Sequence, residues 1–263
     1  MDIISHTFTG VAIGTVVATA SNLSGRKKGW IILLGGIGGA IPDFDAISLW
    51  SKFDSTIGSV LGLGHTGRSI YYGKFWYSHH GALHSVFAAL FLLFIAFLGI
   101  AMIRREYSFN AFKRRIIRYR YGCSSFLLGY LLHLLEDMPT PSGPWGGVNL
   151  FFPSKTYIGG YGKIWWWNNY DLVLIIFTVI FVNLSINLFS KRYYLKKMLA
   201  SIGVFIFGFS LFIFQINNRP IDFSNSASYQ EHERESKRIQ KDILGDRLYQ
   251  FMLSVDNKIP LNF

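Results

Sequence analysis

Residues 81–103 read GALHSVFAALFLLFIAFLGIAMI and contain no Asp, Glu, Lys or Arg. An α-helix needs about 20 mostly apolar residues to cross the hydrocarbon core of a bilayer, and this run meets that length. Five other runs are candidates, although several are shorter or richer in glycine: 3–25, 30–42, 121–135, 172–190 and 198–218. The sequence therefore predicts an all-α fold, a polytopic membrane bundle of about six transmembrane helices.

The composition agrees with a membrane protein. The chain is 51% hydrophobic and only 16% charged, with a mean hydropathy of +0.30, whereas soluble domains contain about 25% charged residues. Its net charge of +11 would also suit nucleic acid, but the cations lie where membrane topology places them, so we expect no nucleic acid as a stable partner. The single Cys123 excludes an intramolecular disulfide and a CxxC metal site.

Three of the short segments between the apolar runs, 24–29, 104–121 and 191–197, are rich in cations, whereas 46–83 and 138–170 are poorer in them. Loops rich in Lys and Arg stay on the cytoplasmic side of a membrane. The alternation therefore predicts that both termini lie outside the cytoplasm. The cations of the three basic segments are Arg26, Lys27, Lys28, Arg104, Arg105, Lys113, Arg114, Arg115, Arg118, Arg120, Lys191, Arg192, Lys196 and Lys197.

The chain divides into a core at 1–155, a Trp-rich loop with two further helices at 156–218, and a charged tail at 219–263. The tryptophans at 165–167 precede the fifth apolar run. They fit an interfacial anchor, or a lip that binds lipid. Apolar residues recur at helical spacing in the tail, which predicts an amphipathic helix on the outer face or against the bundle, or a solvated helix.

Histidines and aspartates gather at the outer ends of four predicted helices. The positive-inside pattern fixes that face without using these residues, so their coincidence is informative. Ionisable groups at membrane depth are costly and mark functional sites. The set is His6, Asp43, Asp45, His79, His80, His84, His133 and Asp137.

Each motif is weak when taken alone. His133 and Asp137 lie one helical turn apart, which suits two metal ligands or a simple hydrogen-bonded pair. Pro42 should end or kink a helix, so the two aspartates that follow it are either ligands or a polar helix end. His80 and His84 have helical spacing, as ligands or as interface histidines. On one face, imidazoles and carboxylates together predict a site for Zn²⁺, with Mn²⁺ or Fe²⁺ as alternatives.

In their order along the chain, these motifs resemble the YdjM family of bacterial membrane-bound, predicted metal-dependent hydrolases. The resemblance covers residues 1–155. It rests on His6, on PDFD at 42–45, HHGALHS at 79–85, GYLLHLLEDMPTPSG at 129–143, and Pro153. His80 stands where the family has Arg, and Leu83 where it has Thr. The resemblance implies an inner-membrane protein whose metal ligands are His6, Asp43, Asp45, His79, His84, His133 and Asp137.

The expected function is hydrolysis by water that one or two metal ions activate. The family's His-x-x-x-Asp blocks are remotely similar to those of zinc-dependent phospholipase C and single-strand nucleases, which favours a phosphoester or lipid-like substrate. His80 either steadies an anionic substrate group or adds a ligand. Glu136 lies about 100° around a helix from Asp137, so it is a candidate general base only where the helix has ended.

Two other histidines are weaker candidates. His65, in the loop between the second and third apolar runs, is a minor candidate for an added ligand or a substrate contact, and His232, in the charged tail, is expected to be solvated. The alternative functions are a non-catalytic protein with a structural metal and a transporter of metal or solute. A transporter needs ligands near the membrane midplane, whereas these lie at one end, which favours an enzyme.

Overall fold

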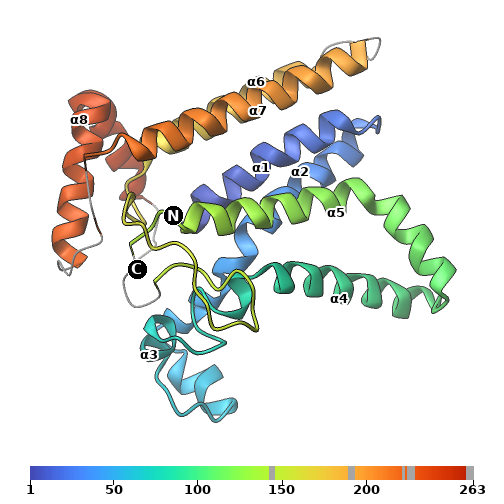
Figure 1. The fold of residues 1–263 in the computed structure, drawn as a ribbon, viewed down its shortest axis with the longest axis horizontal. Helices are drawn as coiled ribbons and strands as arrows, with labels where there is room; N and C mark the ends of the chain where they lie inside the picture. Colours follow the sequence, from blue (N-terminus) through green and yellow to red (C-terminus); the bar gives the residue numbers. More distant parts are fainter. Residues whose placement is uncertain (142–145, 189–192, 221–222, 224–228, 259–263) are drawn as a thin grey trace.

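The computed structural model describes residues 1–141, 146–188, 193–220, 223 and 229–258. The described residues form helices, with two isolated β-bridges, so the all-α prediction is confirmed (Figure 1). The long helices are α1 (Ile3–Ala20), α2 (Gly25–Ala40), α4 (Val86–Arg104), α5 (Phe109–Asp137), α6 (Tyr170–Leu188), α7 (Tyr194–Asn217) and α8 (Tyr229–Asp256). The short ones are η1 (Ile41–Leu49), η2 (Asp54–Gly58), α3 (Gly67–Tyr72) and η3 (Ala82–His84).

Five of these helical segments are long and apolar enough to cross a membrane: α1, α2 with η1, α4, α6 and α7. The sixth expected span falls in α5, whose first half carries the cations expected in a loop at 104–121. The expectation of a loop across 104–121 was wrong, because α5 begins at Phe109. Likewise, Arg26 to Lys28 lie in the first turn of α2. Lys191 and Arg192 lie outside the described residues.

Helix α2 lies between α1 and α5, and glycines bring the three backbones together (Figure 1). A Cβ on Gly35 would lie 2.3 Å from the carbonyl oxygen of Gly10 in α1. On the other side, a Cβ on Gly129 of α5 would lie 2.2 Å from the carbonyl oxygen of Gly35. Small residues permit this approach, so the glycines of α2 let the three helices pack with their backbones close together.

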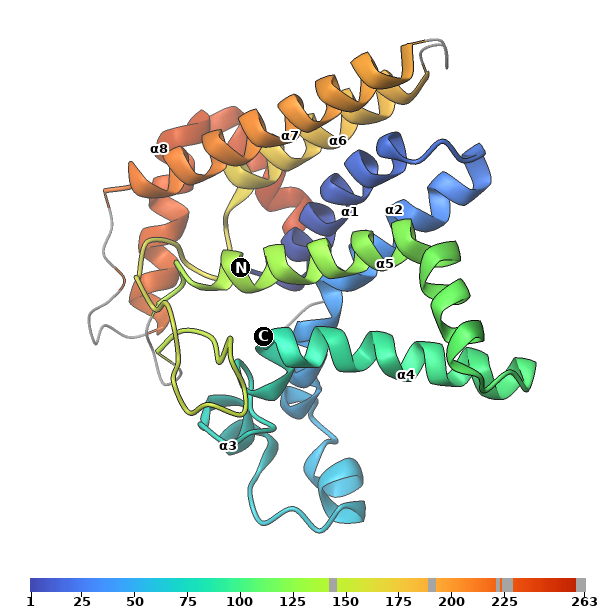
Figure 2. The same ribbon diagram turned by 45° about the vertical axis from the view of Figure 1, so that its right-hand side comes forward.

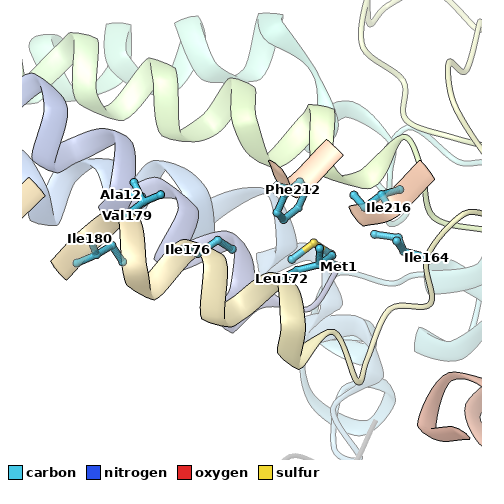
Figure 3. Packing of buried hydrophobic residues seen from close by; sticks show 9 residues of the cluster. All are labelled: Met1, Ala12, Ile164, Leu172, Ile176, Val179, Ile180, Phe212 and Ile216. Carbon is cyan, nitrogen blue, oxygen red and sulfur yellow. The ribbon is translucent and has the colours of Figure 1, made fainter. Parts of the chain in front are cut away.

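Helices α6 and α7 run side by side and cover α1. Figure 3 shows the apolar core that they form with α1, in which Ala12 of α1 lies beside Val179 of α6, and Phe212 of α7 belongs to the same cluster further along. Leu172 and Ile216 extend this core towards the end that carries the histidines. Hydrophobic and dispersion contacts of this kind hold the hairpin against the central three helices.

The C-terminal helix α8 packs on the Trp-rich loop. Trp165 is 2% exposed and donates a hydrogen bond from Nε1 to Glu233 of α8 (2.7 Å). Trp167 donates to Asp256 (2.8 Å). His232 is 8% exposed and lies beside the Trp165 ring. The expectation of a solvated His232 was therefore wrong, because the loop buries this face of α8. Residues 224–228 of the predicted tail lie outside the described residues.

Candidate metal centre

The site is built where α2 and α5 end and α4 is about to begin. Helix α2 stops at Ala40, and Pro42 stands in the first turn of the 3₁₀ helix η1, as expected for a residue that disrupts a helix interior. Asp43 and Asp45 follow within η1. The segment before α4 is irregular except for η3, so the helical pairing expected for His80 and His84 does not occur.

Four buried residues form one group of mutually close ligand atoms: Asp43, His84, His133 and Asp137. His133 Nε2 lies 3.2 Å from His84 Nε2 and 3.0 Å from Asp137 Oδ2. His84 Nε2 lies 3.4 Å from Asp137 Oδ2. Asp43 Oδ1 lies 3.6 Å from His133 Nε2 and 3.7 Å from His84 Nε2. η1, η3 and α5 thus contribute to one cluster.

These distances fit a tetrahedral ion. Zinc bonds of about 2.0–2.2 Å place neighbouring ligands roughly 3.3–3.6 Å apart, which is close to the spacing of this group. In addition, Asp137 Oδ2 is buried without a hydrogen-bond partner among the described residues. Three imidazole nitrogens lie within 3.0–3.7 Å of this oxygen, but a buried carboxylate oxygen without a hydrogen bond is costly, and a cation among these four side chains would satisfy it.

Outer hydrogen bonds orient the imidazoles. His133 Nδ1 donates to the carbonyl oxygen of Gly39 (2.6 Å), because a carbonyl can only accept. In the neutral ring this leaves the lone pair of Nε2 facing Asp137 Oδ2. His84 Nδ1 lies 3.2 Å from Asp45 Oδ2. A hydrogen bond to the second ring nitrogen fixes the tautomer of a metal-binding histidine, so His133 presents Nε2 to the group of four. The ring of His84 also turns Nε2 towards that group, and the contact of its Nδ1 with Asp45 is an ion-pair distance without a hydrogen bond.

A second group consists of His79, His80 and His84. His80 Nδ1 donates to the carbonyl oxygen of Gly147 (2.9 Å), and its Nε2 lies 3.7 Å from Asp137 Oδ2. The two groups therefore adjoin at His84 and Asp137. Burial, aided by His79, lowers the pKa of His80 well below its ordinary value. A neutral imidazole is the form that binds metal, and the lowered pKa favours that form of His80.

The pKa of His84 is shifted in the opposite direction from that of His80. Burial lowers the pKa of His84, but the carboxylates of Asp45, Asp137 and Asp43 outweigh it, and the pKa is raised well above the ordinary value. Three carboxylates thus hold a positive charge at this position. A metal ion bound here would take over that role from the proton.

His6 and Glu136, both expected in the site, lie beside the two groups. His6 Nδ1 lies 2.8 Å from Glu136 Oε2, and His6 Nε2 lies 3.0 Å from Asp137 Oδ1. The amino group of Met1 also lies 3.0 Å from Asp137 Oδ1. Helix α5 continues through Asp137, so the condition set for Glu136 as a general base is not met. Its carboxylate instead supports His6.

The other expected site residues have different surroundings. His65 is exposed and stacks on Phe75 with ring centroids 4.4 Å apart, outside both groups. Asp45 belongs to neither group, but it lies 2.7 Å from His79 Nδ1. The carbonyl groups of Gly39 and Gly147 were missed from the sequence, since no side-chain pattern marks a backbone acceptor. Ser142 and Gly143 of the family motif lie outside the described residues.

The position of Asp45 leads to a testable expectation. Because its carboxylate orients His79 and His84, Asp45→Asn should weaken metal affinity about 10–100-fold rather than abolish binding. Competition titration with a chelator of known affinity measures this. Asp246→Asn on the exposed surface of α8 is the control and should leave affinity unchanged. Complete loss of metal from Asp45→Asn would instead make Asp45 a direct ligand.

Membrane-length helices with a buried imidazole and carboxylate cluster at one end define the chain as a polytopic membrane protein with a candidate metal centre. The family model described as YdjM inner membrane protein matches residues 1–219. The chain therefore belongs to the YdjM family, and the match includes α6 and α7 beyond the region of the motifs. Comparisons with curated proteins and with solved structures give no match.

Proposed function

We propose that the protein is a membrane-bound metal-dependent hydrolase that acts on a phosphoester or lipid-like substrate. A divalent metal, zinc in the first instance, would supply hydroxide near neutral pH by lowering the pKa of bound water to about 7. Asp43, His84, His133 and Asp137 would hold one ion. His79 and His80 would serve a second ion, or His80 would steady an anionic group of the substrate.

The observation that carries this proposal is a cavity of about 350 Å³ against the two groups. Asp43, His79 and His80 line it, together with Arg68 and Tyr71. Catalytic zinc keeps an open position for water or substrate, whereas structural zinc is enclosed by four protein ligands. A cavity beside the ligands supports an open position, and a cation in its wall suits an anionic substrate.

The alternatives are a structural metal and a transporter. A structural ion needs only the group of four. It leaves the adjoining imidazoles of His6, His79 and His80, and the cavity, without a role. A transporter would carry ligands near the middle of its helices, whereas Asp137 is the last residue of α5 and Asp43 follows the end of α2. Both observations favour hydrolysis.

The proposal is tested with protein purified in detergent and loaded with Zn²⁺, Mn²⁺ or Fe²⁺ in turn. Metal content is measured by elemental analysis, and hydrolysis is assayed on phospholipids, lipid-linked phosphates, simple phosphodiesters and carboxylic esters. We expect one or two ions per chain and turnover of at least one phosphoester. Bound metal with saturated protein coordination and no turnover of any substrate would replace the hydrolase with the structural alternative.

Arg68 is expected to bind the anionic group of the substrate. Its guanidinium packs over the Tyr72 ring, 5.4 Å from the centroid, at the cavity wall. Arg68→Gln should raise KM for a phosphodiester about tenfold or more, since charged hydrogen bonds contribute about 1.5–3 kcal/mol, while metal content stays constant. Lys52→Gln, in the same outer segment but away from the cavity, is the matched control. Equal kinetics for the two variants would remove Arg68 from the substrate site.

The orientation in the membrane is a further expectation. The basic ends of α2, α4 and α5 should be cytoplasmic, and the candidate metal centre with both termini should be outside. Alkaline phosphatase fused after Gly160 should be active, and fused after Arg105, at the turn between α4 and α5, it should be inactive. The reverse pattern would place the centre in the cytoplasm.

A further inference from the structure

A second and larger cavity lies away from the candidate metal centre, among α2, α4 and α5. Its volume is about 650 Å³. Apolar side chains form most of its wall, including Leu34 and Ile37 of α2, Leu93 and Ala96 of α4, and Phe126 of α5. Figure 2 shows α4 on one side of α2 and α5. We call this cavity the α4 groove.

One end of the α4 groove is basic. Lys27, in the first turn of α2, and Arg118, in the cationic half of α5, both line it and are exposed. Among the described residues, no carboxylate forms an ion pair with either side chain. Trp30 and Tyr119 line the same end, and amphipathic rings of this kind lie at the headgroup level of a bilayer.

The opposite end of the groove is apolar, and the length between the ends suits a lipid chain. The α2 side runs from Lys27 to Ile41, which is about 20 Å at a rise of 1.5 Å per residue. One leaflet of the hydrocarbon core is about 15 Å thick. The groove is therefore long enough for one acyl chain to lie along it while the headgroup stays beside the cations.

We infer that the α4 groove binds an anionic phospholipid, with an acyl chain along α2 and α4 and the phosphate beside Lys27 and Arg118. Charge complementarity selects this occupant. An apolar helix of a second copy would fill the groove but leave both cations without an anion. Basic pockets between transmembrane helices bind anionic headgroups for the same reason. This inference does not depend on the hydrolase.

The test is native mass spectrometry of the full chain with phosphatidylglycerol and phosphatidylcholine of identical acyl chains. We expect one phosphatidylglycerol to be retained in preference to phosphatidylcholine. A Lys or Arg near an anionic lipid surface contributes about fivefold to affinity. Lys27→Gln and Arg118→Gln should therefore each lower retention of phosphatidylglycerol about fivefold. Arg26→Gln and Arg114→Gln, which remove neighbouring cations outside the groove, are the matched controls and should retain it.

A second pair of variants tests the apolar part. Ala96→Trp fills the groove and should reduce retention of both lipids, whereas Ile95→Trp, one residue away and outside the lining of the groove, should not. Equal retention of the two lipids by the unaltered protein, or equal loss in the control variants, would overturn the inference. So would a dimer that Ala96→Trp dissociates without any change in bound lipid, because the groove would then belong to a second copy.

Discussion

Asp137→Asn is expected to remove both the bound metal and the hydrolytic activity while leaving the helices folded. Asp137 Oδ2 lies within 3.0–3.7 Å of Nε2 of His133, His84 and His80, so its carboxylate contacts both groups of ligands. Asparagine keeps the shape but loses the charge that offsets a cation. Elemental analysis should show near-background metal, and phosphodiester turnover should fall about a hundredfold to a thousandfold, as loss of a key electrostatic group does.

The matched control is Glu136→Gln, a change of the same kind one residue earlier. Glu136 is as deeply buried, but its carboxylate pairs with His6 and belongs to neither ligand group. We expect this variant to keep its metal. Metal loss in both variants, with helical content unchanged, would mean that the ligand set extends to His6 and Glu136. Metal retention in Asp137→Asn would exclude the group of four as the binding site.

Gly35→Ala is expected to prevent stable assembly of the bundle. The added Cβ would lie 2.3 Å from the carbonyl oxygen of Gly10, and neither backbone can yield without separating α1 from α2. Overpacking of flexible side chains costs about 1–3 kcal/mol, and a backbone-to-backbone clash should cost at least the upper value. Thermal unfolding in detergent, followed by far-UV circular dichroism, measures the loss, and expression should fall in parallel.

Gly29→Ala is the matched control in the same helix. A Cβ there meets no atom within 4 Å, and alanine favours a helix by about 0.5–1 kcal/mol over glycine. This variant should be as stable as the parent or more stable. If Gly35→Ala unfolds at the same temperature as Gly29→Ala, the close approach of α1 and α2 is not present in the membrane.

Apolar runs and loop charge predicted most of the fold, because length and hydropathy determine which segments cross a bilayer. They failed at α5. Its cations at 113–120 are typical of a loop, but the helix continues through them, since its own backbone hydrogen bonds do not require an apolar surface. They also failed for His232, because the burial of α8 by the tryptophans depends on contacts between segments far apart in sequence.

The residues that gather at the candidate site were largely predictable from the sequence, but their individual roles were not. His84, His133, Asp43 and Asp137 come together as their motifs indicated. The sequence could not distinguish a ligand from a residue that orients one. Asp43 and Asp45 share one motif, yet Asp43 enters the group of four and Asp45 supports two imidazoles. Only the local path of the 3₁₀ helix separates their roles.

Gly39 contributes both to the candidate metal centre and to the packing of α1 against α2. Its carbonyl oxygen accepts a hydrogen bond from His133 Nδ1. Its missing side chain lets α1 approach, since a Cβ there would lie 2.2 Å from the carbonyl oxygen of His6. Binding of a metal ion at the candidate centre would therefore be linked thermodynamically to the docking of α1. An ion that bound only the folded bundle would add to its stability by mass action, so removing such an ion with a chelator would also weaken the packing of α1 against α2.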